Sequence, residues 1–185
     1  MRGTLSLARG LAASRLRPGA PPAIMRHNAA MGVLTDYFSA PSDAAAASAL
    51  DRVGGPGQPT AGPSPSPPFD TFQSKGLDPY VIMGKLEKAL TGQDYQVITS
   101  GSRYGRMVAK GGAQGPWVVK VSNQLQTALS LAGGDQLARA AAEWSLAEEL
   151  AGASSEEMTG VLKGLSGLAR HATAKDEHLY CWVCL

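Results

Sequence analysis

The chain has 185 residues and a formal charge of +2, and this length predicts one domain with flanking tails. Residues 69–185 carry eleven basic and twelve acidic side chains, without the basic excess that phosphate-backbone binding needs, so general nucleic-acid binding is not expected. No run approaches the roughly 18–20 apolar residues of a membrane span, and two cysteines are too few for a disulfide scaffold, which predicts a cytoplasmic protein with free thiols.

The first thirty residues carry five Arg and no acidic side chain, unlike the rest of the chain. A secretory signal is a poor match, because Arg9, Arg15 and Arg17 interrupt any apolar centre. The composition fits an organellar transit peptide, and it also fits a translation-start extension ahead of a true start at Met31. We favour the second and predict that residues 1–30 form a disordered basic extension. The alanine-rich composition of the chain points to a bacterial source.

The next part of the chain predicts two short elements and a linker. The β-branched and aromatic run 33–38 predicts a strand, and Ser42 is a suitable N-cap for a short helix that extends to about Arg52. Ten of the fifteen residues 54–68 are Gly or Pro, and none is charged. We therefore predict a flexible or polyproline-like surface linker that interrupts a single domain spanning residues 31–185.

The clearest helix signal in the middle of the chain begins at Asp78, a favourable N-cap residue. Ile82, Leu86 and Leu90 then recur every four residues, so that they share one face. Together these residues predict an amphipathic helix over 79–91, which a following glycine ends.

Three β-prone runs follow, at 94–99, 105–110 and 116–121. The segments between them, GSRYG and GGAQG, supply the glycines that tight hairpin turns need. The three runs therefore predict an antiparallel meander. Neither glycine segment matches a phosphate loop or a dinucleotide fingerprint, so no cofactor is expected.

The C-terminal part of the chain predicts three helices. Ser122 opens the first, the second runs over 135–151, and Ser154 with Glu157 forms a capping box at the start of the third. The third helix has the strongest amphipathic pattern. Its apolar face consists of Met158, Val161, Leu162, Leu165, Leu168 and Ala169.

The chain ends in the apolar run HLYCWVCL at residues 178–185. Alternation places apolar side chains on both faces, which predicts an interior strand covered on both sides or an edge strand with a partner. We accordingly predict an α+β fold with a mixed or antiparallel sheet of about four to five strands. This sheet combines 33–38, the meander and 178–185, with helices packed mainly on one face.

Cys181 and Cys184 form a C-x-x-C pair with His178 three residues before it. This pattern invites a metal or redox interpretation, but a structural zinc site needs four ligands. A reactive C-x-x-C usually lies at a helix N-terminus, where the thiol pKa is lowered. Because residues three apart in a strand point to opposite faces, we favour buried structural cysteines and expect no metal.

One local basic cluster stands out in the near-neutral part of the chain. It combines aromatic and cationic side chains on the predicted hairpins, a combination that docks an acidic partner or a single-stranded nucleic acid. The same charges can simply keep strand edges solvated. The candidate binding residues are Arg103, Tyr104, Arg106, Lys110 and Lys120.

Several short motifs occur together along the chain. They are Met31-Gly32 with Tyr37-Phe38, Leu77-Asp78 before a helix that ends in Leu90-Thr91-Gly92, a Leu/Ala-rich last helix and a terminal apolar strand. These motifs resemble the YfbM-like family of small, uncharacterised bacterial α+β domains over residues 31–53 and 69–185. The Pro-rich insertion and the absence of Trp from 79–91 depart from the family pattern. The resemblance implies a fold without an established activity, so it assigns no catalytic residue.

No catalytic motif accompanies these elements, so the leading hypothesis is a non-enzymatic binding module. It would act through contacts with a protein partner, as an accessory or immunity-type protein. The alternative is a small hydrolase-like enzyme, or a thiol- or metal-dependent one, that uses His171, His178, Cys181 and Cys184.

Overall fold

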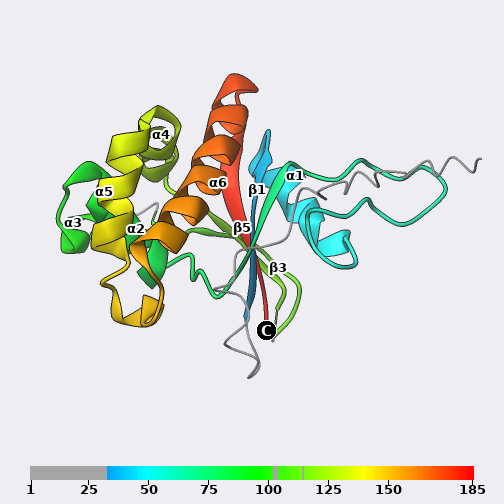
Figure 1. Ribbon diagram of the computed structural model, residues 1–185. Helices are drawn as coiled ribbons and strands as arrows, with labels where there is room; N and C mark the ends of the chain where they lie inside the picture. The colour runs from blue at the N-terminus through cyan, green and yellow to red at the C-terminus, as the bar shows by residue number, and fades with distance from the viewer. Residues whose placement is uncertain (1–32, 102–103, 114) are drawn as a thin grey trace, which may run out of the picture.

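The computed structural model describes residues 33–101, 104–113 and 115–185, so the predicted extension at 1–30 lies outside the described residues. Five strands form one antiparallel sheet in the order β2-β1-β5-β4-β3 (Figure 1). The strands are β1 (Leu34–Ala40), β2 (Thr71–Lys75), β3 (Met107–Lys110), β4 (Trp117–Lys120) and β5 (His178–Cys184). The α-helices are α1 (Asp43–Ala47), α2 (Val81–Thr91), α3 (Tyr95–Ser100), α4 (Asn123–Leu131), α5 (Gly134–Trp144) and α6 (Ser155–Ala174), and the 3₁₀ helices are η2 (Ser48–Asp51) and η3 (Glu148–Leu150).

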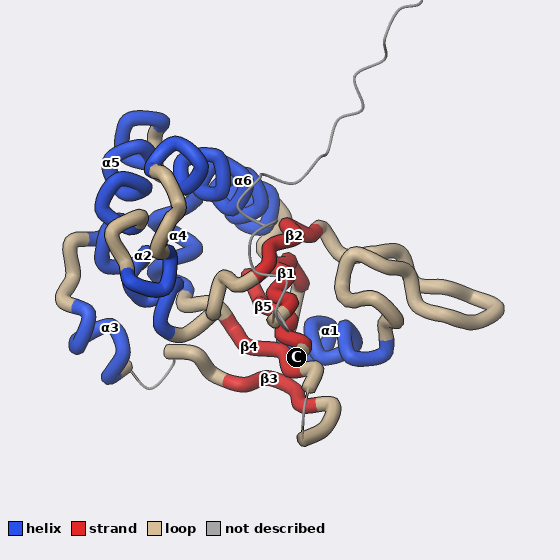
Figure 2. The backbone as a smooth tube through the Cα atoms, turned by 60° about the horizontal axis from the view of Figure 1, so that its bottom comes forward, coloured by secondary structure: helices blue, strands red, loops and turns tan. Residues whose placement is uncertain are grey.

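The sheet separates two unequal layers of structure, as Figures 1 and 2 show. Helices α2, α4, α5 and α6 form one layer, in which α6 contacts β1, β2 and β5. The other layer consists of α1, η2 and the loop that leads to β2, and α1 contacts β1, β3 and β4. This arrangement confirms the predicted α+β fold with helices mainly on one face of the sheet.

β5 is the central strand of the sheet and is buried on both sides. Leu179, Cys181 and Val183 belong to the larger of two apolar clusters, together with residues of α2, α4, α5 and α6. Tyr180 and Trp182 belong to the smaller cluster, together with residues of α1 and η2. We call these two sides the helical face and the loop face. The prediction of an interior strand covered on both sides is confirmed.

The helical face is closed mainly by the last helix. Ser154 and Glu157 form the predicted capping box, in which each side chain accepts a backbone N–H of the other residue. The large apolar side chains of α6 are at most 5% exposed, and burial of each contributes about 1.5–3 kcal/mol. They are Met158, Val161, Leu162, Leu165 and Leu168.

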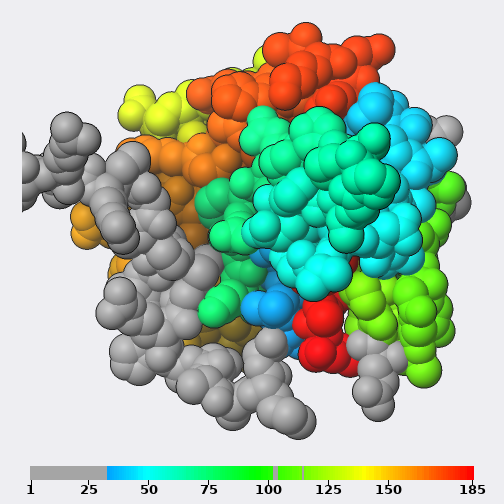
Figure 3. All heavy atoms as spheres, turned by 90° about the vertical axis from the view of Figure 1, so that its right-hand side faces the viewer, coloured from blue at the N-terminus to red at the C-terminus, as the bar shows by residue number. Residues whose placement is uncertain are grey.

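The loop face is covered by α1 and by the Pro-rich segment 54–68, which extends away from the sheet as a long loop (Figure 1). In Figure 3 their cyan and blue-green atoms occupy the centre of this side of the molecule. Arg52 Nη1 donates to Gln58 O at 2.5 Å and to Pro67 O at 3.0 Å, so it joins the two ends of the loop. Segment 54–68 is therefore a loop whose two ends are held together by the hydrogen bonds of Arg52.

Residues 94–99 are not a strand, contrary to the sequence prediction, because they lie in helix α3 and its N-cap. Asp94 Oδ1 accepts a hydrogen bond from Gln96 N at 2.8 Å and so satisfies one of the unpaired donors of the first turn. Val97 is 62% exposed, so this β-branched side chain is not buried against a neighbouring strand, which is the packing that favours β-structure. The predicted three-stranded meander is a β3–β4 hairpin, and β4 pairs with β5.

One further strand and two helix boundaries also differ from the sequence prediction. β2 follows the Pro-rich loop and pairs with β1 at an edge of the sheet, where no strand was predicted. The second C-terminal helix ends at Trp144, because Ala147 already has an extended backbone, and η3 follows it. α2 starts at Val81, since Asp78 Oδ1 accepts the backbone N–H of Tyr80 and Val81 from outside the helix.

Candidate functional site

Three of the five predicted binding residues line one pocket of about 680 Å³ between α2, α3 and the start of α4. Tyr104 and Arg106 lie between α3 and β3, and Lys120 ends β4. Lys110 does not line this pocket, and Arg103 lies outside the described residues. The other walls are Glu87, Ile98, Gly101, Val121, Ser122, Asn123 and Gln124.

The two cations of this pocket are paired with an acid. Asp43, in the first turn of α1, accepts hydrogen bonds from Arg106 Nη2, from Lys120 Nζ at 3.2 Å and from Tyr180 Oη at 2.8 Å. Desolvation acts to raise the pKa of Asp43, but these hydrogen bonds outweigh it and hold that pKa at about 2. Two of the four cations of the predicted basic cluster, Arg106 and Lys120, are therefore paired with Asp43.

Tyr104 fixes the pocket wall against α2. Its hydroxyl donates to Tyr80 O, just before the helix. The ring end lies against Gly84, where a Cβ atom would collide with the hydroxyl oxygen, so the close approach requires glycine at this position. Burial raises the pKa of Tyr104, which keeps the hydroxyl protonated and able to donate.

One buried carboxylate also lines the pocket. Glu87 on α2 is 2% exposed, and its Oε2 accepts a hydrogen bond from Ser122 Oγ at 2.6 Å. Ser122 in turn caps α4 by accepting the backbone N–H of Leu125 at 3.0 Å. Desolvation raises the pKa of Glu87, against the lowering effect of the Ser122 hydrogen bond. Sequence analysis missed Glu87, because nothing local to the helix signals that a neighbouring helix buries it.

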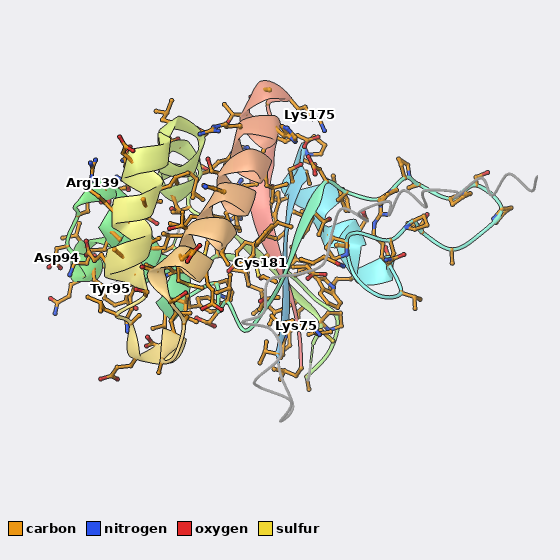
Figure 4. All side chains as sticks on the ribbon, in the orientation of Figure 1. Lys75, Asp94, Tyr95, Arg139, Lys175 and Cys181 are labelled. Carbon is orange, nitrogen blue, oxygen red and sulfur yellow. The ribbon has the colours of Figure 1, made fainter. Side chains whose placement is uncertain are left out.

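The two cysteines do not share a site. Cys181 is fully buried on the helical face (Figure 4), and burial raises the pKa of its thiol. Cys184 is half-buried and packs against the apolar cluster of the loop face. Both thiols are free. Among the described residues, no group of three or more His, Cys, Asp and Glu side chains could hold a metal ion.

The two histidines of the alternative enzyme hypothesis lie in the last turn of α6 and at the start of β5. His171 contacts Asp70 Oδ2 through Nδ1 at 3.2 Å, near the end of α6, with its side chain 69% exposed. His178 begins β5 and Cys184 ends it, a separation of about 20 Å along an extended strand. His178 and Cys184 are therefore beyond the reach that proton transfer between a base and a nucleophile needs.

A second groove, of about 350 Å³, lies on the loop face between α1, the end of the Pro-rich loop and the turn before β5. Arg52 lines this groove although the residue is 5% exposed. Its guanidinium stacks on Phe69, with 4.3 Å between Cζ and the ring centroid. Sequence analysis gave Arg52 only a helix-end position, because its carbonyl partners lie six and fifteen residues further along the chain.

The loop face also buries an acid beside an indole. Asp36 on β1 is opposite Trp182 on β5. A Cβ atom on Gly55 would lie 3.3 Å from Asp36 Oδ2 and 3.4 Å from the Trp182 ring, so the loop packs directly on both. Desolvation raises the pKa of Asp36 to about 6, despite a hydrogen bond from the Ser74 backbone and the attraction of Lys75.

Comparison with protein-family models, with curated proteins and with solved structures found no match to this chain. The resemblance to the YfbM-like family therefore stays a prediction, and no residue role comes from a relative. Among the described residues, no helix combines the length and the apolar character needed to cross a bilayer.

Proposed function

We propose that this protein is a non-catalytic binding module that contacts a partner protein at the pocket between α2, α3 and α4. The observation that carries this proposal is the convergence of Tyr104, Arg106 and Lys120 on one concavity of about 680 Å³. A partner side chain that enters such a concavity loses more contact with water than one that rests on a flat surface.

The compensated charge of the pocket favours a protein partner over a nucleic acid. Because Asp43 pairs with Arg106 and Lys120, the site offers hydrogen-bonding groups without a strong positive field. Phosphate-backbone binding depends on uncompensated Lys and Arg, whereas protein interfaces are enriched in Tyr and Arg and depleted of charge at their core. We therefore propose an accessory or immunity-type role in the cytoplasm, without general nucleic-acid binding.

Site-directed photocrosslinking in lysate of the source organism tests this proposal. A photoreactive amino acid replaces Gln124, which lines the pocket, or Thr127, which is exposed on the same helix but does not line it. We expect a discrete, stoichiometric protein adduct from position 124 and none from position 127. Gln124→Trp, but not Thr127→Trp, should then abolish capture of the same protein. Equal adducts at both positions, or none at either, contradict the pocket as the contact surface.

A further inference from the structure

We propose that the groove on the loop face binds an oxyanion, a carboxylate or a phosphate group, through the guanidinium of Arg52. This groove shares no lining residue with the pocket of the proposed function. The two proposals therefore stand on different observations, and the failure of one leaves the other in place.

Arg52 is a buried cation without a counter-ion. The residue is 5% exposed, and no carboxylate among the described residues forms an ion pair with it. Buried charges in proteins are paired or bound to a ligand, because an isolated charge loses its hydration without compensation. The same desolvation lowers the pKa of Arg52. An anion in the groove supplies the missing counter-charge.

The hydrogen bonds of Arg52 leave one edge of its guanidinium free. Nη1 uses both of its hydrogens, on Gln58 O at 2.5 Å and on Pro67 O at 3.0 Å. Nε has no acceptor among the described residues, and Nη2 donates to none of them either. The Nε–Nη2 edge is a fork of two parallel N–H groups, which carboxylate and phosphate oxygens fill with two hydrogen bonds.

The guanidinium is held in place before a ligand arrives. The two loop carbonyls fix one end of it, and the Phe69 ring supports its plane. Nε is sealed from solvent, so an oxyanion that fills both donors of the fork must displace the atoms that cover Nε. A side chain that is already ordered loses little conformational entropy when it binds.

The groove wall carries charges of both signs beside Arg52. Lys175, at the end of α6 in Figure 4, adds a second positive charge to the groove wall. Asp70 and Glu177 add two negative charges, of which Asp70 contacts His171, and Glu177 accepts a hydrogen bond from Ser39 Oγ at 2.5 Å. The two cations and the two acids balance, so recognition of an anion rests on the unpaired donors of Arg52 and not on a net positive charge of the groove.

Titration of the ¹⁵N-labelled full chain with sodium phosphate and, separately, with sodium acetate tests the site at constant ionic strength. We expect the Nε–H resonance of Arg52 to shift saturably with at least one of these anions. Saturation with phosphate alone identifies a phosphate site, with acetate alone a carboxylate site, and with both a general oxyanion site. The absence of a saturable shift at Arg52 with either anion overturns the proposal.

Two variants distinguish recognition by the paired N–H donors of Arg52 from attraction by its positive charge alone. Arg52→Lys keeps the positive charge but loses the two parallel donors, so we expect affinity to fall about tenfold or more. The matched control is Arg139→Lys, on an exposed position of α5 on the other side of the molecule (Figure 4), and it should leave the affinity unchanged. Equal affinity in Arg52→Lys and the wild type overturns the proposal. If Arg52→Lys does not fold, the Arg52 resonance of the wild type decides alone.

Discussion

The two faces of the sheet are covered by different kinds of structure, and they differ in whether buried hydrogen-bond donors find acceptors. On the helical face, Trp144 Nε1 donates to Ile82 O at 2.9 Å and Ser166 Oγ donates to Leu129 O at 2.8 Å, so the packed helices supply acceptors. Both sealed side-chain donors that lack a partner among the described residues lie on the loop face, and they are Arg52 Nε and Trp182 Nε1. Regular helix packing thus satisfies what it buries, whereas the irregular cover leaves donors for a ligand to satisfy.

The largest effect is expected where the helical face is most densely packed. Leu165 on α6 is fully buried, so Leu165→Asp removes an apolar side chain and places a charge without a partner in the core. The lost packing alone costs about 2–5 kcal/mol and the charge several more, which together approach the whole stability of a typical domain. We expect no cooperative thermal transition by circular dichroism. Lys163→Asp, exposed on the same helix, should melt like the wild type, and a cooperative melt of Leu165→Asp contradicts this placement.

The two buried indoles allow a direct comparison of the faces. Trp144→Phe removes a buried hydrogen bond and some ring volume, so we expect the free energy of unfolding to fall by about 2–3 kcal/mol. Trp182→Phe removes similar volume but also a donor without a described partner, so we expect a loss of about 1 kcal/mol or less. Urea unfolding of the two variants measures both. Equal losses would show that the loop face satisfies its donors as well as the helical face does.

The free energy of unfolding should depend on pH through Asp36, which is buried on the loop face. The pKa of Asp36 is raised from 3.8 to about 6 by desolvation, so the native protein holds this proton more tightly than the unfolded chain. Stability from this group is therefore greatest below pH 3.8 and falls as pH rises to about 6, by about 2–3 kcal/mol in total. Asp36→Asn should not show this fall. Urea unfolding of wild type and variant across pH 4–7 measures the difference, and parallel profiles refute the shift.

Asp43 provides the opposite case when the same urea unfolding measurements are extended down to pH 2. The hydrogen bonds from Tyr180, Arg106 and Lys120 overcome desolvation and lower the pKa of Asp43 to about 2. This group therefore stabilises the fold above pH 3.8, and its contribution is lost as pH falls towards 2. Asp43→Asn should be less stable than the wild type at neutral pH and approach it in acid, whereas Asp36→Asn should gain on the wild type as pH rises.

The helical face could be predicted well from the sequence because its signals are local. Ser122 and Ser154 cap α4 and α6 as expected, and Gly92 ends α2 in the left-handed conformation that glycine favours. Apolar spacing then identified which side of α6 is buried. The loop face depends on contacts that no local pattern records, such as the pairing of β2 with β1 and the bonds from Arg52 to distant loop carbonyls.

The candidate site was predicted in part for the same reason. Tyr104, Arg106 and Lys120 were grouped by their nearness in sequence, and they do line one pocket. Asp43, which pairs with two of them, lies 63 residues from Arg106 and 77 from Lys120. No sequence motif has either spacing. The sequence therefore showed the positive charges of the cluster but not that Asp43 pairs with two of them.

The smallest effect is expected at α3, where the strand prediction was wrong. Asp94→Ala removes the side chain that accepts the Gln96 N–H, and loss of an N-cap costs about 1 kcal/mol. Because α3 contacts α2 and carries one buried residue, Ile98, we expect a local rather than a global loss. Amide exchange at Gln96 should accelerate while the urea midpoint hardly moves, and Asp94→Asn, which keeps an acceptor, should restore protection. A large shift of the midpoint would instead make α3 an integral part of the helical layer.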